Sequence, residues 1–275
     1  MRTLFDSLLT RIGALSVIWI IILLTSAICS TSSWAVRDSC YGTTETEDGA
    51  GRSAAPANSY GGSTSLTGDK FDITKLLLRP LNVSTKLGAG ATITACTLYF
   101  NVSSTNNGKI VSAHRVFKPW PEGTASAADP GTNPGATWVC WDADSDDSSG
   151  WGTAGCENAS DAGSDNSSKG SGNDRKVTAE GTVTLGASTG YYKVVISNAL
   201  AQAWYDGTAA TNGVCLSTNA SGAWFITTSE NASGKPYFVF EYTTSGGAAL
   251  PSAIYKQGVS GLIYKAGESG KRSKP

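Results

Sequence analysis

Hydrophobic and polar residues alternate in short segments along most of this 275-residue chain. The clearest segment is ATITACTLYFNV, residues 91–102, in which every second side chain points to the same face. One face carries Thr94, Cys96, Leu98, Phe100 and Val102, and the other carries Ile93, Ala95, Thr97 and Tyr99. Because both faces are fairly apolar, we expect a central strand. Further strands are predicted at residues 75–83, 109–117, 181–186, 213–218, 224–229 and 236–243.

One segment has helical character. Within YYKVVISNALAQAWYDG, residues 191–207, Ser197 is a suitable N-cap and residues 199–204 have a helical composition. We expect two turns of helix there at most. Short strands separated by Gly, Asn, Ser and Asp clusters predict an all-β fold: a two-sheet antiparallel β-sandwich or jelly roll with one short helix.

A long polar insert interrupts the strand pattern. Residues 123–175 are mostly Ser, Gly, Asp, Asn and Ala, which makes the insert too long for an ordinary hairpin and too polar for a core. We expect either a functional segment or a disordered one. The composition of the whole chain, rich in Gly, Ser and Thr, also favours strands and turns over helices.

The first 35 residues differ from the rest. Basic residues precede an uncharged apolar stretch at residues 12–28, and small residues at Ser33 and Ala35 fit the pattern that signal peptidase reads. We predict a cleaved signal peptide and hence an extracellular protein. An uncleaved membrane anchor at residues 12–28 is the alternative, because the stretch approaches the length of a membrane span.

The chain therefore divides into three parts: a signal peptide or signal anchor at residues 1–35, a β-sandwich domain at 36–244, and a linker with a basic tail at 245–275. The tail contains IYKQG and later IYKAG. A small hairpin, a segment that docks on a partner and a chance similarity all remain open for this short repeat.

The charge of the chain limits the classes of partner that we expect. With 16% charged residues and a formal net charge of −1, the sequence lacks the basic surface that neutralises phosphates in nucleic-acid-binding proteins. We expect no nucleic-acid partner. Contact with a membrane is expected only through the leader, if the leader stays uncleaved.

Seven motifs occur in an order that is itself informative: NSYGG at 58–62, KLLLRP at 75–80, GAGATITACTLYF at 88–100, HRVFKPWPEGT at 114–124, GATWVCW at 135–141, AQAWYDGTAATNGVCL at 201–216 and TTSENASGKPYFVFEYT at 227–243. This order resembles the DNRLRE-type domain, a secreted β-sandwich related to carbohydrate-binding modules and to domains found beside disaggregatase-type enzymes. The resemblance covers most of residues 55–243 and implies a non-catalytic, often carbohydrate-associated role. It implies no defined ligand site.

Two positions depart from the family pattern. Pro80 stands where the family usually has an aromatic residue, and a proline there predicts an edge strand or a bulge because it cannot donate a ladder hydrogen bond. Val139 stands where an Asn often follows the Thr-Trp pair.

The insert contains an unusual acidic loop, CWDADSDDSSGWGTAGC, at residues 140–156. Asp142, Asp144 and Asp146 occupy the first, third and fifth places of an EF-hand-type calcium loop, and Asp147 adds a fourth carboxylate. The sixth place lacks the usual Gly and the twelfth lacks the usual Glu. A calcium site and a solvated acidic turn both remain open.

Cysteines close the same loop. We predict a disulfide between Cys140 and Cys156, because the two residues bound a short polar loop in an oxidising compartment. Removal of the leader leaves an odd number of cysteines, namely Cys40, Cys96, Cys140, Cys156 and Cys215. At least one thiol should therefore stay reduced or pair between chains.

Trp141 and Trp151 are the candidate ligand-binding residues, because a flat aromatic ring beside polar groups suits a pyranose. Packing beneath the loop is the alternative for both side chains.

No catalytic set of residues is visible. His114 is the only histidine, and Glu122 and Glu230, the candidates for paired carboxylates, fall in turn motifs where backbone hydrogen bonds explain them. We therefore expect a non-catalytic exported module that binds a polysaccharide or a cell-surface glycan at the cell surface or in the extracellular matrix. The alternatives are a structural or adhesion protein, such as a surface-layer or virion component, and a fragment of a disaggregatase-type enzyme.

Overall fold

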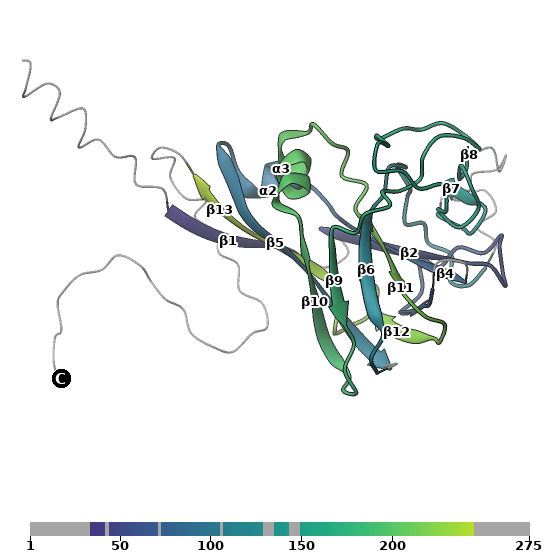
Figure 1. Ribbon diagram of the computed structural model, residues 1–275. Coiled ribbons are helices and arrows are strands. Elements are labelled where there is room, and N and C mark those ends of the chain that lie inside the picture. Colours follow the sequence, from purple (N-terminus) through teal and green to yellow (C-terminus); the bar gives the residue numbers. More distant parts are fainter. Residues whose placement is uncertain are drawn as a thin grey trace, which may run out of the picture.

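The structure, a computed structural model, describes residues 34–41, 44–70, 73–104, 107–128, 135–142 and 149–244. These residues form two packed antiparallel sheets, an additional two-stranded hairpin and two helices, as Figure 1 shows. The prediction of an all-β, two-sheet sandwich is confirmed. The bounds of the elements outside the two main sheets are β7 (Cys140–Asp142), β8 (Ser149–Gly150), α2 (Val83–Leu87) and α3 (Asn198–Asp206).

The first sheet is centred on β5, which is paired along both of its edges. β10 lies on one edge, β13 and β12 occupy successive parts of the other, and β1 and β3 extend the sheet further. The prediction of a central strand here is therefore confirmed. The strands of this sheet are β1 (Trp34–Tyr41), β3 (Ser65–Gly68), β5 (Ala91–Ser104), β10 (Gly190–Ile196), β12 (Trp224–Thr227) and β13 (Tyr237–Thr244).

A bulge in β5 changes which side chains face inward. Glu241 pairs with Ala95, whereas the next residue, Tyr242, pairs with Ile93, so Thr94 has no partner of its own. Ile93 consequently joins the buried face and Thr94 is exposed. Uninterrupted alternation predicted the opposite placement of both residues, and that prediction was wrong.

The second sheet has the strand order β2-β4-β11-β6-β9. The expectation that Pro80 places its strand at an edge or in a bulge was wrong, because β4 lies between β2 and β11. β11 pairs only with Leu76, Leu77 and Leu78, so Pro80, the last residue of β4, lies beyond that ladder. The strands are β2 (Thr46–Arg52), β4 (Thr74–Pro80), β6 (Ile110–Arg115), β9 (Gly181–Thr184) and β11 (Val214–Thr218).

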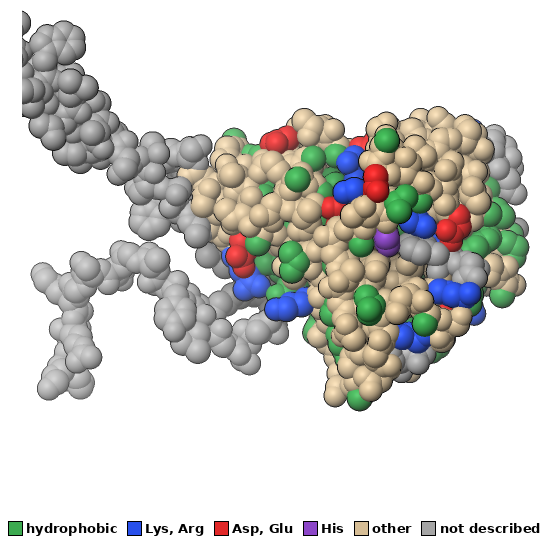
Figure 2. Space-filling view, in the orientation of Figure 1, with side chains coloured by type: hydrophobic (Ala, Val, Ile, Leu, Met, Phe, Trp, Pro, Cys, Tyr) green, Lys and Arg blue, Asp and Glu red, His purple; other side chains and the backbone are tan. Residues whose placement is uncertain are grey.

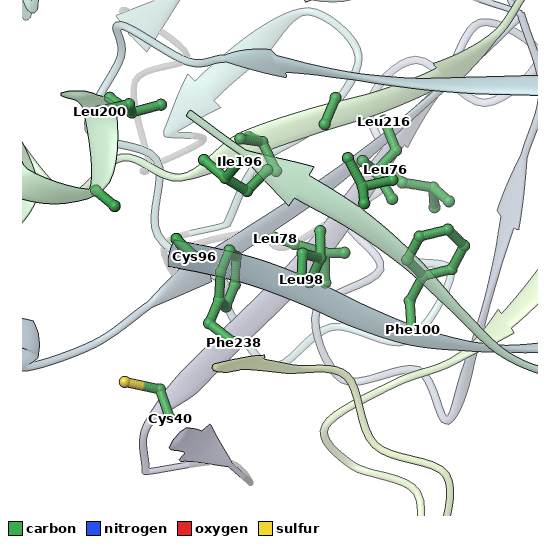
Figure 3. Close-up of a cluster of buried hydrophobic side chains, with 14 of the residues drawn as sticks. Cys40, Leu76, Leu78, Cys96, Leu98, Phe100, Ile196, Leu200, Leu216 and Phe238 are labelled. Carbon is green, nitrogen blue, oxygen red and sulfur yellow. The ribbon is translucent and has the colours of Figure 1, made fainter. Parts of the chain in front are cut away.

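The main core lies between the inner faces of the two sheets. Figure 3 shows Leu98 and Phe100 of β5 close to leucines of the second sheet, with α3 contributing at one end. Cys96 is fully buried in this core, on the face that alternation predicted for it. The labelled core residues of the other elements are Cys40, Leu76, Leu78, Ile196, Leu200, Leu216 and Phe238.

The predicted short helix is confirmed as α3, although its nine residues make it slightly longer than the two turns expected. The Ser197 hydroxyl oxygen accepts a hydrogen bond from the Leu200 N–H at 3.4 Å, which satisfies one of the amides that the first turn leaves unpaired. The residues directly before α3 form β10. At the other helix, α2, the chain turns helical at Val83, where the sequence pattern predicted the end of a strand.

The insert contains little regular structure but forms a second core. Trp120, Trp141 and Trp151 pack with Cys156 and with Leu77, whose side chain projects from the outer face of the second sheet. The expectation that the insert is too polar for a core was therefore wrong. The other members of this second core are Val116, Ala136 and Cys215.

Buried polar groups fix the course of the insert around this second core. The Asp174 carboxylate accepts hydrogen bonds from the backbone N–H groups of Gly152, Thr153 and Asn158, at 2.7, 3.0 and 3.0 Å. Lys118, which is fully buried, donates from its ammonium group to one side-chain oxygen and two carbonyls of the insert. These contacts replace water for groups that would otherwise be costly to bury.

Among the described residues, no helix is long and apolar enough to cross a membrane. The predicted leader lies outside the described residues except for Trp34 and Ala35, whose backbone belongs to β1. The linker and the tail at residues 245–275 also lie outside them.

Replacing Asp174 by Ala should destabilise the protein by roughly 3 kcal/mol, because the variant leaves three backbone donors without their acceptor. Urea denaturation measures this change. Asp161→Ala is the matched control, since the exposed Asp161 carboxylate of the same insert accepts two hydrogen bonds from Thr178. The control should lose much less stability, and equal losses would contradict the structural role of Asp174.

Candidate functional site

Both tryptophans predicted to bind a ligand are buried. Trp141 is 7% exposed and Trp151 is 4% exposed, and both belong to the second core. The indole N–H of Trp151 donates to the Thr137 carbonyl at 3.0 Å. Neither ring presents a face to a sugar, so the prediction of a platform at these two residues is corrected in favour of the packing alternative.

The described residues contain no disulfide, so the predicted link between Cys140 and Cys156 is absent from the structure. The Cys156 thiol instead hydrogen-bonds with the thiol of Cys215 on β11. Burial raises the pKa of the Cys156 thiol well above its usual value. The reason for the correction is tertiary: the insert folds against the outer face of β11, which brings a cysteine distant in sequence next to Cys156.

Only part of the predicted calcium loop lies within the described residues. Asp142 lies on β7 and is half-buried, whereas Asp144, Asp146 and Asp147 fall outside the described residues. A calcium site in this loop therefore stays a prediction.

A cluster of three carboxylates forms elsewhere, from Asp48, Glu122 and Glu230, and we call it the acidic cluster. One carboxylate oxygen from each residue lies within 4.8 Å of the other two. Asp48 belongs to β2 of the second sheet, Glu122 to the segment that follows β6, and Glu230 to the turn after β12 of the first sheet. The fold thus brings together the two glutamates that the sequence singled out, with one aspartate that it did not.

Hydrogen bonds and close packing hold the acidic cluster in place. The backbone N–H of Asp48 donates to Glu122 Oε1 at 2.8 Å, and the N–H of Ser229 donates to Asp48 Oδ2 at 2.5 Å. The Ser229 hydroxyl lies 3.1 Å from Glu122 Oε1 and 2.9 Å from Glu230 Oε2. A Cβ atom on Gly61 would lie only 1.9 Å from the Glu122 carbonyl oxygen, so the glycine allows the backbone of Glu122 to pack this closely.

Burial favours the protonated forms of two carboxyl groups of the acidic cluster, those of Asp48 and Glu122. Burial raises the pKa of Asp48 to about 7, although the hydrogen bond from the Ser229 backbone opposes this shift. Burial also raises the pKa of Glu122 to about 8. The hydrogen bond from the Asp48 backbone lowers this pKa, whereas the neighbouring acidic charges raise it further. Such a group of oxygens can share a proton or bind a cation. Hydrolysis of a glycosidic bond requires that bond to lie between two carboxyl groups. In this cluster the Ser229 hydroxyl already bridges Glu122 and Glu230.

Four tyrosines gather on the outer face of the first sheet, and we call this surface the tyrosine face: Tyr41 of β1, Tyr99 of β5, Tyr191 of β10 and Tyr237 of β13. The rings of Tyr99 and Tyr237 are stacked, with centroids 4.8 Å apart and planes 4° apart. Tyr41 and Tyr191 each meet Tyr237 edge-on, at 5.7 and 5.6 Å. The register explains the cluster, because Tyr237 lies directly opposite both Tyr41 and Tyr99.

The tyrosine face is accessible and partly polar. Tyr41 is 46% exposed and Tyr191 is 48% exposed. The exposed Lys193 lies directly opposite Tyr99, and Asn101 lies opposite Tyr191, in the pairing of β10 with β5. On the side of the molecule drawn in Figure 2, charged and hydrophobic side chains are scattered among uncharged polar groups and backbone.

Three residues of these two candidate features escaped prediction from the sequence, for two reasons. Asp48 and Tyr41 lie on strands whose small and polar residues gave no alternating apolar pattern, and Tyr191 lies on a strand that was read only as the approach to a helix. An acidic residue on an inward position of a recognised strand would have been the signal for Asp48.

His114 lies on β6, directly opposite Cys215 of the second core in the pairing of β6 with β11. Its Nδ1 lies 3.2 Å from the Lys176 carbonyl oxygen. Burial, followed by the charge of Arg175, lowers the pKa of His114 to about 4, so the ring is neutral at pH 7. A local structural role accounts for these contacts.

No known family model matches this chain, and no curated protein matches its sequence.

Refolding the chain in a glutathione redox buffer should produce a link between Cys156 and Cys215, because these two thiols already touch in the fold. Peptide mapping by mass spectrometry under non-reducing conditions identifies the linked peptides. The same link should persist in a Cys140→Ser variant. A link between Cys140 and Cys156 in the wild type would contradict this assignment.

Acidification should remove a contribution of His114 to stability. Its folded pKa of about 4 lies below the unfolded value, so the folded state binds fewer protons between pH 6.5 and 4, and stability is lost as the pH falls through this window. Relative to a His114→Gln variant, the wild type should lose roughly 2 kcal/mol of unfolding free energy between pH 7 and pH 5. The comparison with the variant cancels the titration of other groups, and a difference independent of pH would refute the prediction.

Proposed function

We propose that this chain is a non-catalytic exported module that binds a polysaccharide or cell-surface glycan through the tyrosine face. The observation that carries the proposal is the clustering of four tyrosine rings across four neighbouring strands on a solvent-facing sheet. Trp141 and Trp151 are buried, whereas two rings of the tyrosine face, those of Tyr41 and Tyr191, are exposed and therefore open to a ligand.

The chemistry of the face suits a sugar. A pyranose has an apolar face of C–H groups and a rim of hydroxyls, so it needs aromatic surface with hydrogen-bonding groups beside it. Tyr41 and Tyr191 expose about half of their surface. Polar side chains lie on the same face, because Asn101 lies directly opposite Tyr191 and Lys193 directly opposite Tyr99 in the pairing of β10 with β5. Tyr237 contacts both exposed rings edge-on, and Tyr99 stacks on Tyr237.

A rigid sheet makes this surface effective. The four tyrosines lie on paired strands, so little conformational freedom of the backbone is lost when a ligand binds. Tyr191 is held further by a hydrogen bond from its hydroxyl to the Lys235 carbonyl at 3.1 Å. The resemblance of the motif order to DNRLRE-type domains supports the same carbohydrate-associated role and an exported location.

The test is a glycan array, followed by titration of the best ligand with a Tyr41→Ala, Tyr191→Ala double variant. We expect the double variant to lose at least about tenfold in affinity, because two ring contacts of roughly 1 kcal/mol each disappear. The fold should survive, since both side chains are half-exposed.

Val195→Ala is the matched control. Val195 is 59% exposed and lies on the same strand and the same face as Tyr191, so its loss removes exposed apolar surface without removing a ring. Unchanged affinity in the double variant, or equal losses in the control, would refute the tyrosine face as the binding surface. Absence of glycan binding together with assembly of the chain into larger particles would favour a structural or adhesion protein instead.

A further inference from the structure

The acidic cluster draws oxygen atoms from parts of the chain that are far apart in sequence. Asp48 and Glu122 are separated by 74 residues and Asp48 and Ser229 by 181, yet hydrogen bonds connect both pairs. The contributing segments come from both sheets of the sandwich. Three carboxylates at this spacing repel one another strongly unless protons or a cation intervene.

The described residues provide little positive charge for these carboxylates. Within that part of the chain, no Lys or Arg forms an ion pair with Asp48, Glu122 or Glu230. Lys235 acts on Asp48 electrostatically, but the hydrogen bond from its ammonium group goes to the Ser229 carbonyl. The single proton of the Ser229 hydroxyl is shared between two glutamates.

A second observation, independent of the clustering, points to a ligand. Asp48 is fully buried, and its Oδ1 atom has neither contact with solvent nor a hydrogen-bond donor. A buried carboxylate oxygen without a partner costs several kcal/mol. One oxygen of this carboxylate lies within 4.8 Å of an oxygen from each of the two glutamates, so a ligand bound by Asp48 would sit among all three residues.

We propose that Asp48, Glu122 and Glu230 bind one calcium ion, which connects the two sheets. Each residue offers oxygen, which hard divalent cations prefer, and the cluster has no nitrogen or sulfur ligand of the kind that zinc selects. Calcium lies 2.3–2.6 Å from its ligands, so one ion can contact oxygens that are up to about 5 Å apart. The spacing in the cluster falls within that limit.

The proposed ion has a structural consequence that does not depend on the tyrosine face. Asp48 and Glu122 are fixed to the second sheet, whereas Glu230 lies in the turn that connects β12 to β13 of the first. An ion bound to all three would hold this end of the sandwich closed. Stability should therefore depend on calcium, and glycan binding is not needed to detect the effect.

The test uses the full chain after removal of metal with EDTA. Isothermal titration with calcium should show a site that Asp48→Asn abolishes, and millimolar calcium should raise the melting temperature of the wild type by several degrees. Without calcium, Asp48→Asn should be at least as stable as the wild type, because it removes a buried charge while keeping an oxygen for the Ser229 N–H. Glu230→Gln should weaken calcium binding at least tenfold and serves as the second variant.

Glu241→Gln is the matched control, since it neutralises an exposed carboxylate on the neighbouring strand β13 that pairs with Arg37 at 3.8 Å. It should bind calcium as the wild type does. An Asp144→Asn, Asp146→Asn double variant separates this site from the acidic loop and should keep the rise in melting temperature. Calcium binding that survives Asp48→Asn, no binding at millimolar calcium, or an equal stabilisation by magnesium would overturn the proposal.

Discussion

Burial of the inner face of β5 against the second sheet is the interaction on which the rest of the structure depends. Leu98 and Phe100 are fully excluded from solvent there, and each large apolar side chain contributes roughly 1.5–3 kcal/mol when buried. Since alternate residues of a strand point to opposite faces, fixing Leu98 and Phe100 inward places Tyr99 outward. The tyrosine face is thus a direct consequence of how the core is packed.

The second sheet differs from the first because it is covered on both faces. Its inner face meets β5, and its outer face carries Leu77 and Cys215 into the second core beneath the insert. This explains why every residue of β11 is buried and why the LLL run of β4 shows no alternation. The polar insert is ordered by few apolar groups and many hydrogen bonds, in which Asp174 and Lys118 are central.

One turn connects the two candidate functional features. Lys235 donates to the Ser229 carbonyl beside the acidic cluster, and its own carbonyl accepts the hydrogen bond from Tyr191 on the tyrosine face. The residues that position Glu230 therefore also support one ring of the proposed glycan surface. The backbone of this turn packs closely against the Asn101 side chain at Gly234. A Cβ atom at this position would lie only 2.3 Å from Asn101 Nδ2.

The sequence by itself determined the fold class, the central strand β5 and the helix capped by Ser197, because these depend on local periodicity and local hydrogen bonding. It also identified Glu122 and Glu230 as the carboxylates to examine. Only the tertiary structure decided that these glutamates meet Asp48, that Cys156 meets Cys215, and that Trp141 and Trp151 are buried. Such contacts join residues far apart in the chain, and they depend on strand order, register and the bulge at Thr94, none of which leaves a signal in local composition.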